Sequence, residues 1–262
     1  TIRLDSVPVR HESSSLPETS LLDAAAPVSV LRQLIESSQV PPDESGCALI
    51  QDGRTALIAR LALAKLATQT LDVQYYLWQD DETGRLLARG MLEAADRGVR
   101  VRMLIDDIHL AGRETGWAAL DRHRNISIRI FNPFRVRAWP SLKRLVEVIR
   151  EGGRLNHRMH NKAFVADRLM AIVGGRNIGD SYFEVHQDTN FRDMDVFAVG
   201  PIVRKASAVF DQFWNGDWVV PVKALLNWAS TEAALQSVLK TASELTAAKP
   251  YPYPLTEDVA TL

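Results

Sequence analysis

The sequence is poor in cysteine, in long apolar runs and in net charge. Cys47 is the only cysteine among 262 residues, which excludes an internal disulfide. The best candidate for a membrane span, 56–67, is too short and is interrupted by Arg60 and Lys65. A formal net charge of -1 gives no overall basic field for non-specific nucleic-acid binding. With 46% hydrophobic residues, the chain can bury one large core or two modest ones.

Composition divides the chain into three stretches. Residues 1–45 are rich in Ser and Pro and weakly patterned, so we expect an N-terminal arm with one short helix at 28–37. Residues 46–248 hold the periodic segments and form the predicted folded domain. Residues 249–262 open with alternating prolines, which exclude a helix or a central strand, and we expect a Pro/Tyr-rich linker or tail.

Strand and helix patterns alternate through the central stretch. Strands are predicted at 70–78, 99–105, 126–131, 163–166, 169–173 and 194–199. Helices are predicted at 54–68, 84–97, 114–122, 141–150, 201–214 and over most of 222–248. Gly152 and Gly153 are expected to end the helix 141–150. This alternation predicts an α/β fold, an α/β/α sandwich on a mixed, largely parallel sheet.

One short segment concentrates residues suited to chemistry on phosphate. His160 and Lys162 are two residues apart, so in an extended strand their side chains leave the same face. Histidine can act as a nucleophile or proton carrier at neutral pH, and lysine is a compact cation for a phosphate oxygen. Polar and small residues follow across the next two predicted strands: Asp167, Gly174, Gly175 and Asn177. The set indicates phosphoryl chemistry on a phosphodiester without a metal.

This spacing resembles the HKD motif of the phospholipase D superfamily. The resemblance covers roughly residues 52–222 and includes the strand and helix patterns that precede the motif. Within the superfamily, the neighbourhoods 158–162 and 174–183 are most similar to bacterial cardiolipin synthases, especially those of type C. The resemblance therefore implies a phospholipase D-like fold and action on phospholipids.

The resemblance also implies catalytic roles. His160 would attack phosphorus and form a phosphohistidine, which splits one difficult displacement into two easier steps. Lys162 and Asn177 would hold the non-bridging oxygens as charge gathers on them. A carboxylate would fix the histidine tautomer through the far ring nitrogen; Asp193 is the first candidate and Asp195 the alternative.

Other polar residues of the region are expected to have supporting roles. Asp167 closes the strand turn by hydrogen bonding, and Gly174 and Gly175 lead the chain back towards the first strand. Asp106 and Asp107 end a predicted strand, but adjacent residues in extended chain diverge, and no third ligand matches them. We therefore expect neither a metal nor another cofactor.

The family pattern contains two such motifs, whose histidines face each other. One histidine is the nucleophile and the other protonates the leaving alcohol. None of the other histidines is followed by lysine two residues later: His11, His109, His123, His157 and His186. The chain thus carries half an active site, completed by a longer chain or by a homodimer, as in small single-motif bacterial nucleases of the family. The Pro/Tyr-rich tail and the long elements before the motif favour the longer chain.

Residues 131–140 interleave aromatic side chains with arginines. Phe134, Arg135, Arg137 and Trp139 are candidates for membrane contact, with rings in the headgroup layer and arginines on anionic phosphate. A solvated loop is one alternative. Contact with unpaired nucleic-acid bases is another, although nucleic acid is the less favoured partner.

These observations favour a phosphatidyl transferase that makes cardiolipin from phospholipids. Such an enzyme is expected to lie peripherally on the bacterial cytoplasmic membrane, or otherwise in the cytoplasm. The alternative is a metal-independent phosphodiesterase or nuclease that acts as a single-motif dimer. A third hypothesis is a regulatory or scaffolding half-domain without activity.

Overall fold

The computed structural model describes residues 29–38, 40–110, 114–136, 142–186 and 188–226. Its elements are α1 (Val30–Ser37), β1 (Gly46–Ile50), α2 (Gly53–Leu66), β2 (Thr70–Tyr75), α3 (Glu82–Asp96), β3 (Arg100–Asp106), η2 (Asp107–His109), α4 (Glu114–Leu120), β4 (Ile126–Phe131), α5 (Leu142–Leu155), β5 (Ala163–Ala166), β6 (Met170–Gly174), η3 (Asp180–Tyr182), β7 (Asp195–Val199), α6 (Pro201–Trp214), β8 (Val219–Pro221) and η4 (Val222–Leu225).

The strands form one mixed sheet in the order β1-β7-β6-β5-β2-β3-β4-β8. Only the neighbours β2–β3 and β3–β4 are parallel, and the other five pairs are antiparallel. The sheet is mixed as predicted, but the expectation that it is largely parallel is wrong. Among neighbouring strands, crossover helices join β2 to β3 and β3 to β4, whereas β5 and β6 are joined by a tight turn that forces them antiparallel.

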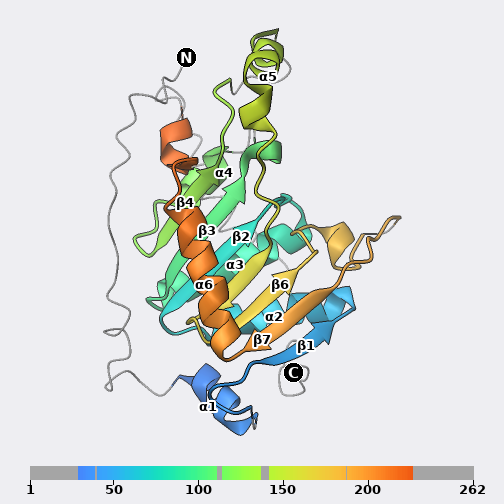
Figure 1. Cartoon of the computed structure of the whole chain (residues 1–262), viewed down its shortest axis with the longest axis vertical. Coiled ribbons are helices and arrows are strands. Elements are labelled where there is room, and N and C mark those ends of the chain that lie inside the picture. The colour runs from blue at the N-terminus through green and yellow to red at the C-terminus, as the bar shows by residue number, and fades with distance from the viewer. Residues whose placement is uncertain (1–28, 39, 111–113, 137–141, 187, 227–262) are drawn as a thin grey trace.

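Helices cover both faces of the sheet, which confirms the predicted sandwich (Figure 1). α2 and α3 lie on one face and share the main core with inward side chains such as Val101 and Met103. α6 crosses the other face, where its Phe210 and Trp214 pack against Leu104 of the same strand β3. The alternation of these neighbours along β3 is what a strand buried on both faces requires.

Local signals in the sequence account for where the main helices begin. The Asp52 carboxylate accepts a hydrogen bond from the Thr55 N–H at 2.7 Å and caps α2. Asp81 caps α3 in the same way, accepting from the Gly84 N–H at 2.9 Å. α6 begins at a proline, which needs no hydrogen-bond partner for its nitrogen at that position.

Several boundaries differ from those expected. β2 ends at Tyr75, and Trp78, the last residue of the predicted strand, forms an isolated parallel bridge with Ile178. α5 extends to Leu155, but Glu151 is non-helical, with φ at -117° and ψ at 17°, so the first part of α5 ends at the predicted Arg150 and a short second part contains Gly152 and Gly153. β1 and β8, the two edge strands, were not predicted. Of the helix expected at 222–248, the described part is the short turn η4, and the rest lies outside the described residues.

Several strands begin or end at one edge of the sheet, namely the edge that lies across the strand ends. β2, β3 and β4 run parallel, so their carboxyl ends lie side by side. Gln74 near the end of β2 pairs with Ala163 at the start of β5. Ala163 in turn faces Val173 near the end of β6, and Gly174 faces Asp195 at the start of β7. Residues just before β5 and β7, and just after β2, β3 and β6, therefore meet at this edge.

Candidate active site

His160 and Lys162 lie at this edge, immediately before β5, and meet around the ring of Tyr76. The His160 ring centroid is 4.8 Å from that of Tyr76, with the planes at 58°. The Lys162 ammonium lies 5.6 Å from the same centroid, and it donates a hydrogen bond to the His160 carbonyl at 2.6 Å. His160 is exposed, whereas Lys162 is only 6% exposed. The structure thus brings the two motif side chains together with the imidazole facing solvent.

Asp106, at the end of β3, binds the two residues that precede His160 in the chain. Its carboxylate accepts hydrogen bonds from the Met159 N–H at 2.9 Å and from the Arg158 guanidinium at 3.0 Å. The Gln74 amide also donates to the Met159 sulfur at 3.0 Å. Burial raises the pKa of Asp106, and the charge of Arg158 acts in the opposite direction. Asp106 therefore holds the residues before the histidine in place.

Asp193 lies on the Lys162 side of the site. Burial lowers the pKa of Lys162, and the Asp193 carboxylate opposes that shift. The same carboxylate packs against Gly175, where an added Cβ would approach its Oδ1 to 2.6 Å. Gly175 is thus required by the close approach of Asp193, and the pair joins the turn after β6 to the segment before β7.

Asp195, two residues later, faces the interior. It is 0% exposed and lies between two buried arginines, Arg60 at 2.9 Å and Arg176 at 3.4 Å. Its Oδ1 also occupies the space beside Gly174, where a Cβ would come within 2.1 Å. The structure therefore places Asp195 beneath the turn that carries Gly174 and Asn177, in a buried ion cluster.

Asn177 connects the turn after β6 with the end of β2. Its Oδ1 accepts from the Leu77 N–H at 3.1 Å, and its Nδ2 donates to the Tyr182 hydroxyl at 3.1 Å. Beside it, the Ile178 N–H donates to the Leu77 carbonyl at 3.1 Å. The amide is 6% exposed and is held at the same edge as His160.

Asp167 lies at the opposite end of β5, away from this edge. Its carboxylate accepts from the backbone N–H groups of Thr68, Gln69 and Thr70 at 2.8–3.2 Å, and from the Thr68 hydroxyl at 2.9 Å. Asp167 itself has a φ of 51°, a left-handed conformation that aspartate tolerates better than most residues. The carboxylate is thus occupied in joining the β5–β6 turn to the start of β2.

The membrane-facing assignment of Phe134 is wrong. Phe134 is 6% exposed and lies beneath the Arg158 guanidinium, 5.3 Å from its ring centroid. Arg135 is exposed and forms an ion pair with Glu151 at 2.9 Å. Arg137 and Trp139 lie outside the described residues. The turn at Asn132 and Pro133 folds the aromatic ring inward, which the alternation of aromatics and arginines did not reveal.

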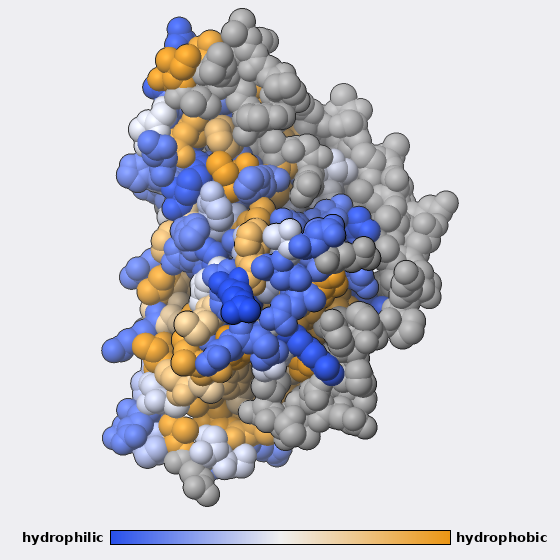
Figure 2. Space-filling model, turned by 90° about the vertical axis from the view of Figure 1, so that its right-hand side faces the viewer, coloured by the Kyte–Doolittle hydropathy of each residue, from blue (hydrophilic) through white to orange (hydrophobic). Residues whose placement is uncertain are grey.

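Exposed apolar side chains occur instead on α5, which projects from the body of the molecule (Figure 1). Ile149 is 74% exposed and Val146 is 38% exposed. Figure 2 shows one face of the molecule, with hydrophilic residues across its middle and hydrophobic residues near the top, at the height of α5. Within the described ranges, no helix combines the length and apolar character needed to cross a bilayer.

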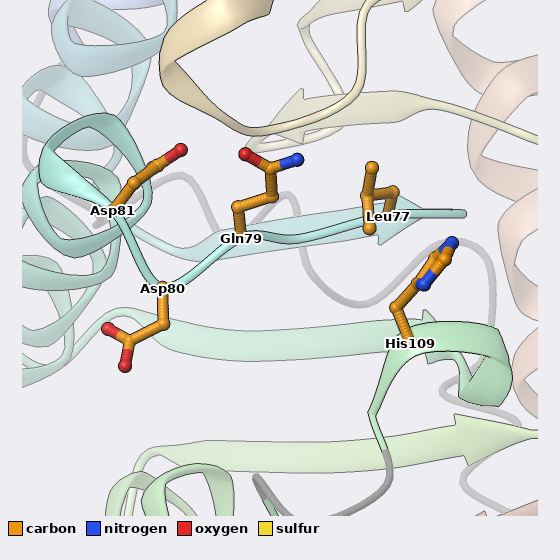
Figure 3. Close-up of a pocket in the computed structure, with 5 residues that line it drawn as sticks. All are labelled: Leu77, Gln79, Asp80, Asp81 and His109. Atoms are coloured by element: carbon orange, nitrogen blue, oxygen red, sulfur yellow. The ribbon is translucent and has the colours of Figure 1, made fainter.

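Two aromatic residues of the site escaped the sequence reasoning, Tyr76 and His109. Tyr76 directly follows β2, and its ring centroid lies 4.8 Å from that of His160 and 6.5 Å from that of His109. The pair Tyr75-Tyr76 gave a usable signal, because alternation at a strand end buries one ring and turns the next towards the edge. His109 also lines a cavity with Leu77, Gln79 and two aspartates (Figure 3).

Comparison with known proteins identifies the relatives of this chain. A family model described as "Cardiolipin synthase, PLD-like domain" matches residues 57–214. Cardiolipin synthase C of Escherichia coli is 44% identical over 193 residues, which cover 74% of this chain and 40% of that protein. The chain therefore spans well under half the length of this relative.

Solved structures show the same fold. NucT from Helicobacter pylori superposes with a TM-score of 0.51 at 16% identity and covers 68% of this chain and 99% of its own. Phosphatidylserine synthase of Haemophilus influenzae gives a TM-score of 0.52 at 16% identity, over 86% of this chain and 50% of that protein. At these identities the likeness concerns the fold alone.

Proposed function

Because the chain belongs to the family of cardiolipin synthase, PLD-like domains, we propose that it forms half the active site of a phosphatidyl transferase that makes cardiolipin. The observation that carries the proposal is the convergence of His160 and Lys162 on Tyr76 at an open sheet edge. An exposed imidazole beside a buried ammonium suits attack on an anionic phosphodiester. The 44% identity to a cardiolipin synthase supports the choice of lipid substrates.

In the proposed first step, an imidazole nitrogen of His160 attacks the phosphorus of a phospholipid. An N–P bond forms, and the P–O bond to the head group breaks. The departing alkoxide takes a proton from a second histidine that this chain does not contain. In the second step a hydroxyl of another phospholipid attacks the phosphohistidine and gives its proton to that second histidine. An O–P bond replaces the N–P bond, and His160 is regenerated.

Neighbouring groups would stabilise the charge that develops on the phosphoryl oxygens. Lys162 supplies a fixed positive charge in a partly desolvated position, where its attraction for an oxyanion is stronger than in water. Asn177, held by Leu77 and Tyr182, would present its amide to a second oxygen. Asp193 would keep the local charge balanced beside Lys162 and orient the imidazole.

The second motif would come from outside this chain, in a longer polypeptide or a second copy. The chain covers 40% of the cardiolipin synthase it matches, which leaves room for another domain in that relative. We favour the longer polypeptide. Adding a protein that carries a second His-x-Lys motif should then restore activity to an inactive single half.

The test uses the full-length protein that carries this chain, incubated with phosphatidylglycerol vesicles with and without phosphatidylethanolamine. Formation of cardiolipin with release of the head-group alcohol would support the proposal. Absence of both products, with EDTA-resistant cleavage of DNA or RNA, would replace it by the nuclease alternative. Inactivity on every substrate despite a complete second motif would favour a scaffolding role.

Peripheral contact with the membrane follows from lipid substrates, and we propose α5 as the contacting element. Its exposed Ile149 lies on a helix that projects from the body beyond β4. Ile149→Asp should reduce sedimentation with phosphatidylglycerol vesicles. Val209→Asp, which alters a 42% exposed valine on α6, is the matched control. Equal binding by both variants and the wild type would remove α5 from the interface.

A further inference from the structure

Asn132 lies directly after β4 and is almost fully buried, at 1% exposed. Its φ of 45° is left-handed, a conformation that glycine adopts freely and that asparagine tolerates better than most residues. Unlike glycine, asparagine adds an amide that can donate and accept hydrogen bonds. Resting on the proposed function, we propose that Asn132 is a positioning residue that holds His160 in place for attack on phosphorus.

The segment that carries His160 has no regular secondary structure of its own. Residues 157–162, between α5 and β5, belong to neither a helix nor a strand. The position of the imidazole therefore depends on the contacts made by the residues beside it. A displacement of about 1 Å can lower the rate of a reaction about 10²-fold, so these contacts matter to catalysis.

The Asn132 amide fixes the start of this segment. Its Nδ2 donates to the carbonyls of Arg154 at 2.9 Å and of His157 at 2.8 Å. The Arg154 carbonyl lies in the last turn of α5, where carbonyl groups lack partners within the helix. The amide Oδ1 accepts from the Arg154 guanidinium, and the Asn132 N–H donates to the Trp218 carbonyl at 2.6 Å. One side chain thus joins the end of α5 to the first residue of the segment.

The backbone carbonyl of Asn132 extends these contacts to Arg158. It accepts from the Arg158 guanidinium at 2.8 Å, and the same guanidinium donates to the Asp106 carboxylate at 3.0 Å. Asp106 also accepts from the Met159 N–H at 2.9 Å. The two residues directly before His160 are therefore held between the ends of β3 and β4. Loss of the Asn132 amide would loosen this arrangement from the β4 side.

The test follows the first chemical step alone. The full-length protein, in excess over a phosphatidyl ester of p-nitrophenol, releases nitrophenol in a single turnover whose rate reports attack by His160. Asn132→Gly keeps the left-handed φ and removes the amide. It should lower the maximal rate by about 10–100-fold, because the nucleophile is displaced. The half-saturating protein concentration should stay within about threefold of wild type, because the groups that contact the lipid are unchanged.

Asn125→Gly is the matched control, because Asn125 lies just before the other end of β4. Its Nδ2 also donates to a carbonyl near the end of a helix, that of Ala95 in α3, at 2.9 Å. The control thus removes a comparable hydrogen bond at the opposite end of the strand from His160. It should lower Tm as Asn132→Gly does, but leave the maximal rate of the folded protein within about twofold of wild type.

Arg158→Lys tests the same contacts without altering Asn132. Lysine keeps the positive charge beside Asp106, but it lacks the planar fork that also reaches the Asn132 carbonyl. Its maximal rate should fall about tenfold. Asn132→Gly and Arg158→Lys combined should lose less than the sum of the two separate losses in activation free energy, because both break the same connection.

The outcomes separate this proposal from the proposed function. A maximal rate of Asn132→Gly within about twofold of wild type, corrected for the folded fraction, would overturn the positioning role even if Tm falls. Equal slowing by Asn125→Gly would overturn it too. If Asn132→Gly does not fold, Arg158→Lys decides, and a normal rate in that variant would end the proposal. Failure of the wild type to release nitrophenol would instead overturn the proposed function.

Discussion

Two aspartates of one segment should respond in opposite ways to the same substitution. Asp195 is fully buried between Arg60 and Arg176, whereas Asp193 lies beside Lys162 at the open edge. Changing either carboxylate to an amide conserves its shape and removes one charge. We expect Asp195→Asn to lower stability and Asp193→Asn to lower the rate.

The structure sets the size of both effects. Asp195→Asn leaves two buried guanidinium groups without their carboxylate, and breaking a buried pair costs about 3–5 kcal/mol. For a domain of this size, each kcal/mol corresponds to about 2–4 °C in Tm, so the loss should be roughly 6–20 °C. Asp193→Asn should leave Tm within about 2 °C, because no buried guanidinium among the described residues pairs with Asp193. Its rate should fall by about 10²–10⁴-fold, as for other carboxylates that orient a catalytic histidine.

The assay combines differential scanning calorimetry with cardiolipin formation by the full-length protein, measured well below the lower Tm. Turnover by Asp195→Asn, once corrected for the folded fraction, should stay within about threefold of wild type. The reasoning is refuted if Asp195→Asn loses turnover at an unchanged Tm while Asp193→Asn keeps both. In that case Asp195 would be the orienting carboxylate.

Substitutions at three further residues test individual contacts. Burial lowers the pKa of Lys162, so its ammonium should lose its proton, and activity should decline, at a pH below the usual lysine range. In Lys162→Arg the alkaline limb of the kcat/KM profile should move to higher pH, and identical limbs in the variant and the wild type would contradict this. Tyr76→Ala should reduce kcat about tenfold or more through loss of the ring that contacts the imidazole and the ammonium, whereas Tyr76→Phe should retain activity; equal losses would point to the hydroxyl instead. Asp167→Ala removes the hydrogen bonds that this carboxylate accepts, so it should lower the free energy of unfolding in urea titrations by about 2–4 kcal/mol and leave kcat of the folded protein unchanged. A large loss of kcat without destabilisation would give Asp167 a catalytic role.

Much of the fold could be predicted from the sequence, because the strongest patterns are local. The pattern at 201–214 and that at 163–166 have the observed boundaries of α6 and β5. Strand direction could not be predicted in the same way, since it depends on whether a crossover helix or a short turn joins two strands. The edge strand β1 was missed because three of its five residues are exposed and give no apolar run.

The site could be predicted in part. The spacing of His160 and Lys162 was visible in the sequence, but the ring that both contact belongs to Tyr76, just after β2 and about eighty residues earlier. Phe134 was assigned to a membrane surface because local alternation cannot show that Arg158 covers its ring. Contacts between distant segments decide such cases, and a single sequence carries little information about them.

The proposed mechanism requires His160 to form a covalent bond to phosphorus. Rapid acid quenching of the full-length protein during turnover of phosphatidylglycerol, followed by peptide mass spectrometry, tests it directly. We predict a phosphatidyl adduct on the peptide that contains His160, absent from a His160→Ala variant that also makes no cardiolipin. Normal turnover by His160→Ala, or an adduct located on another residue of this chain, would contradict the account.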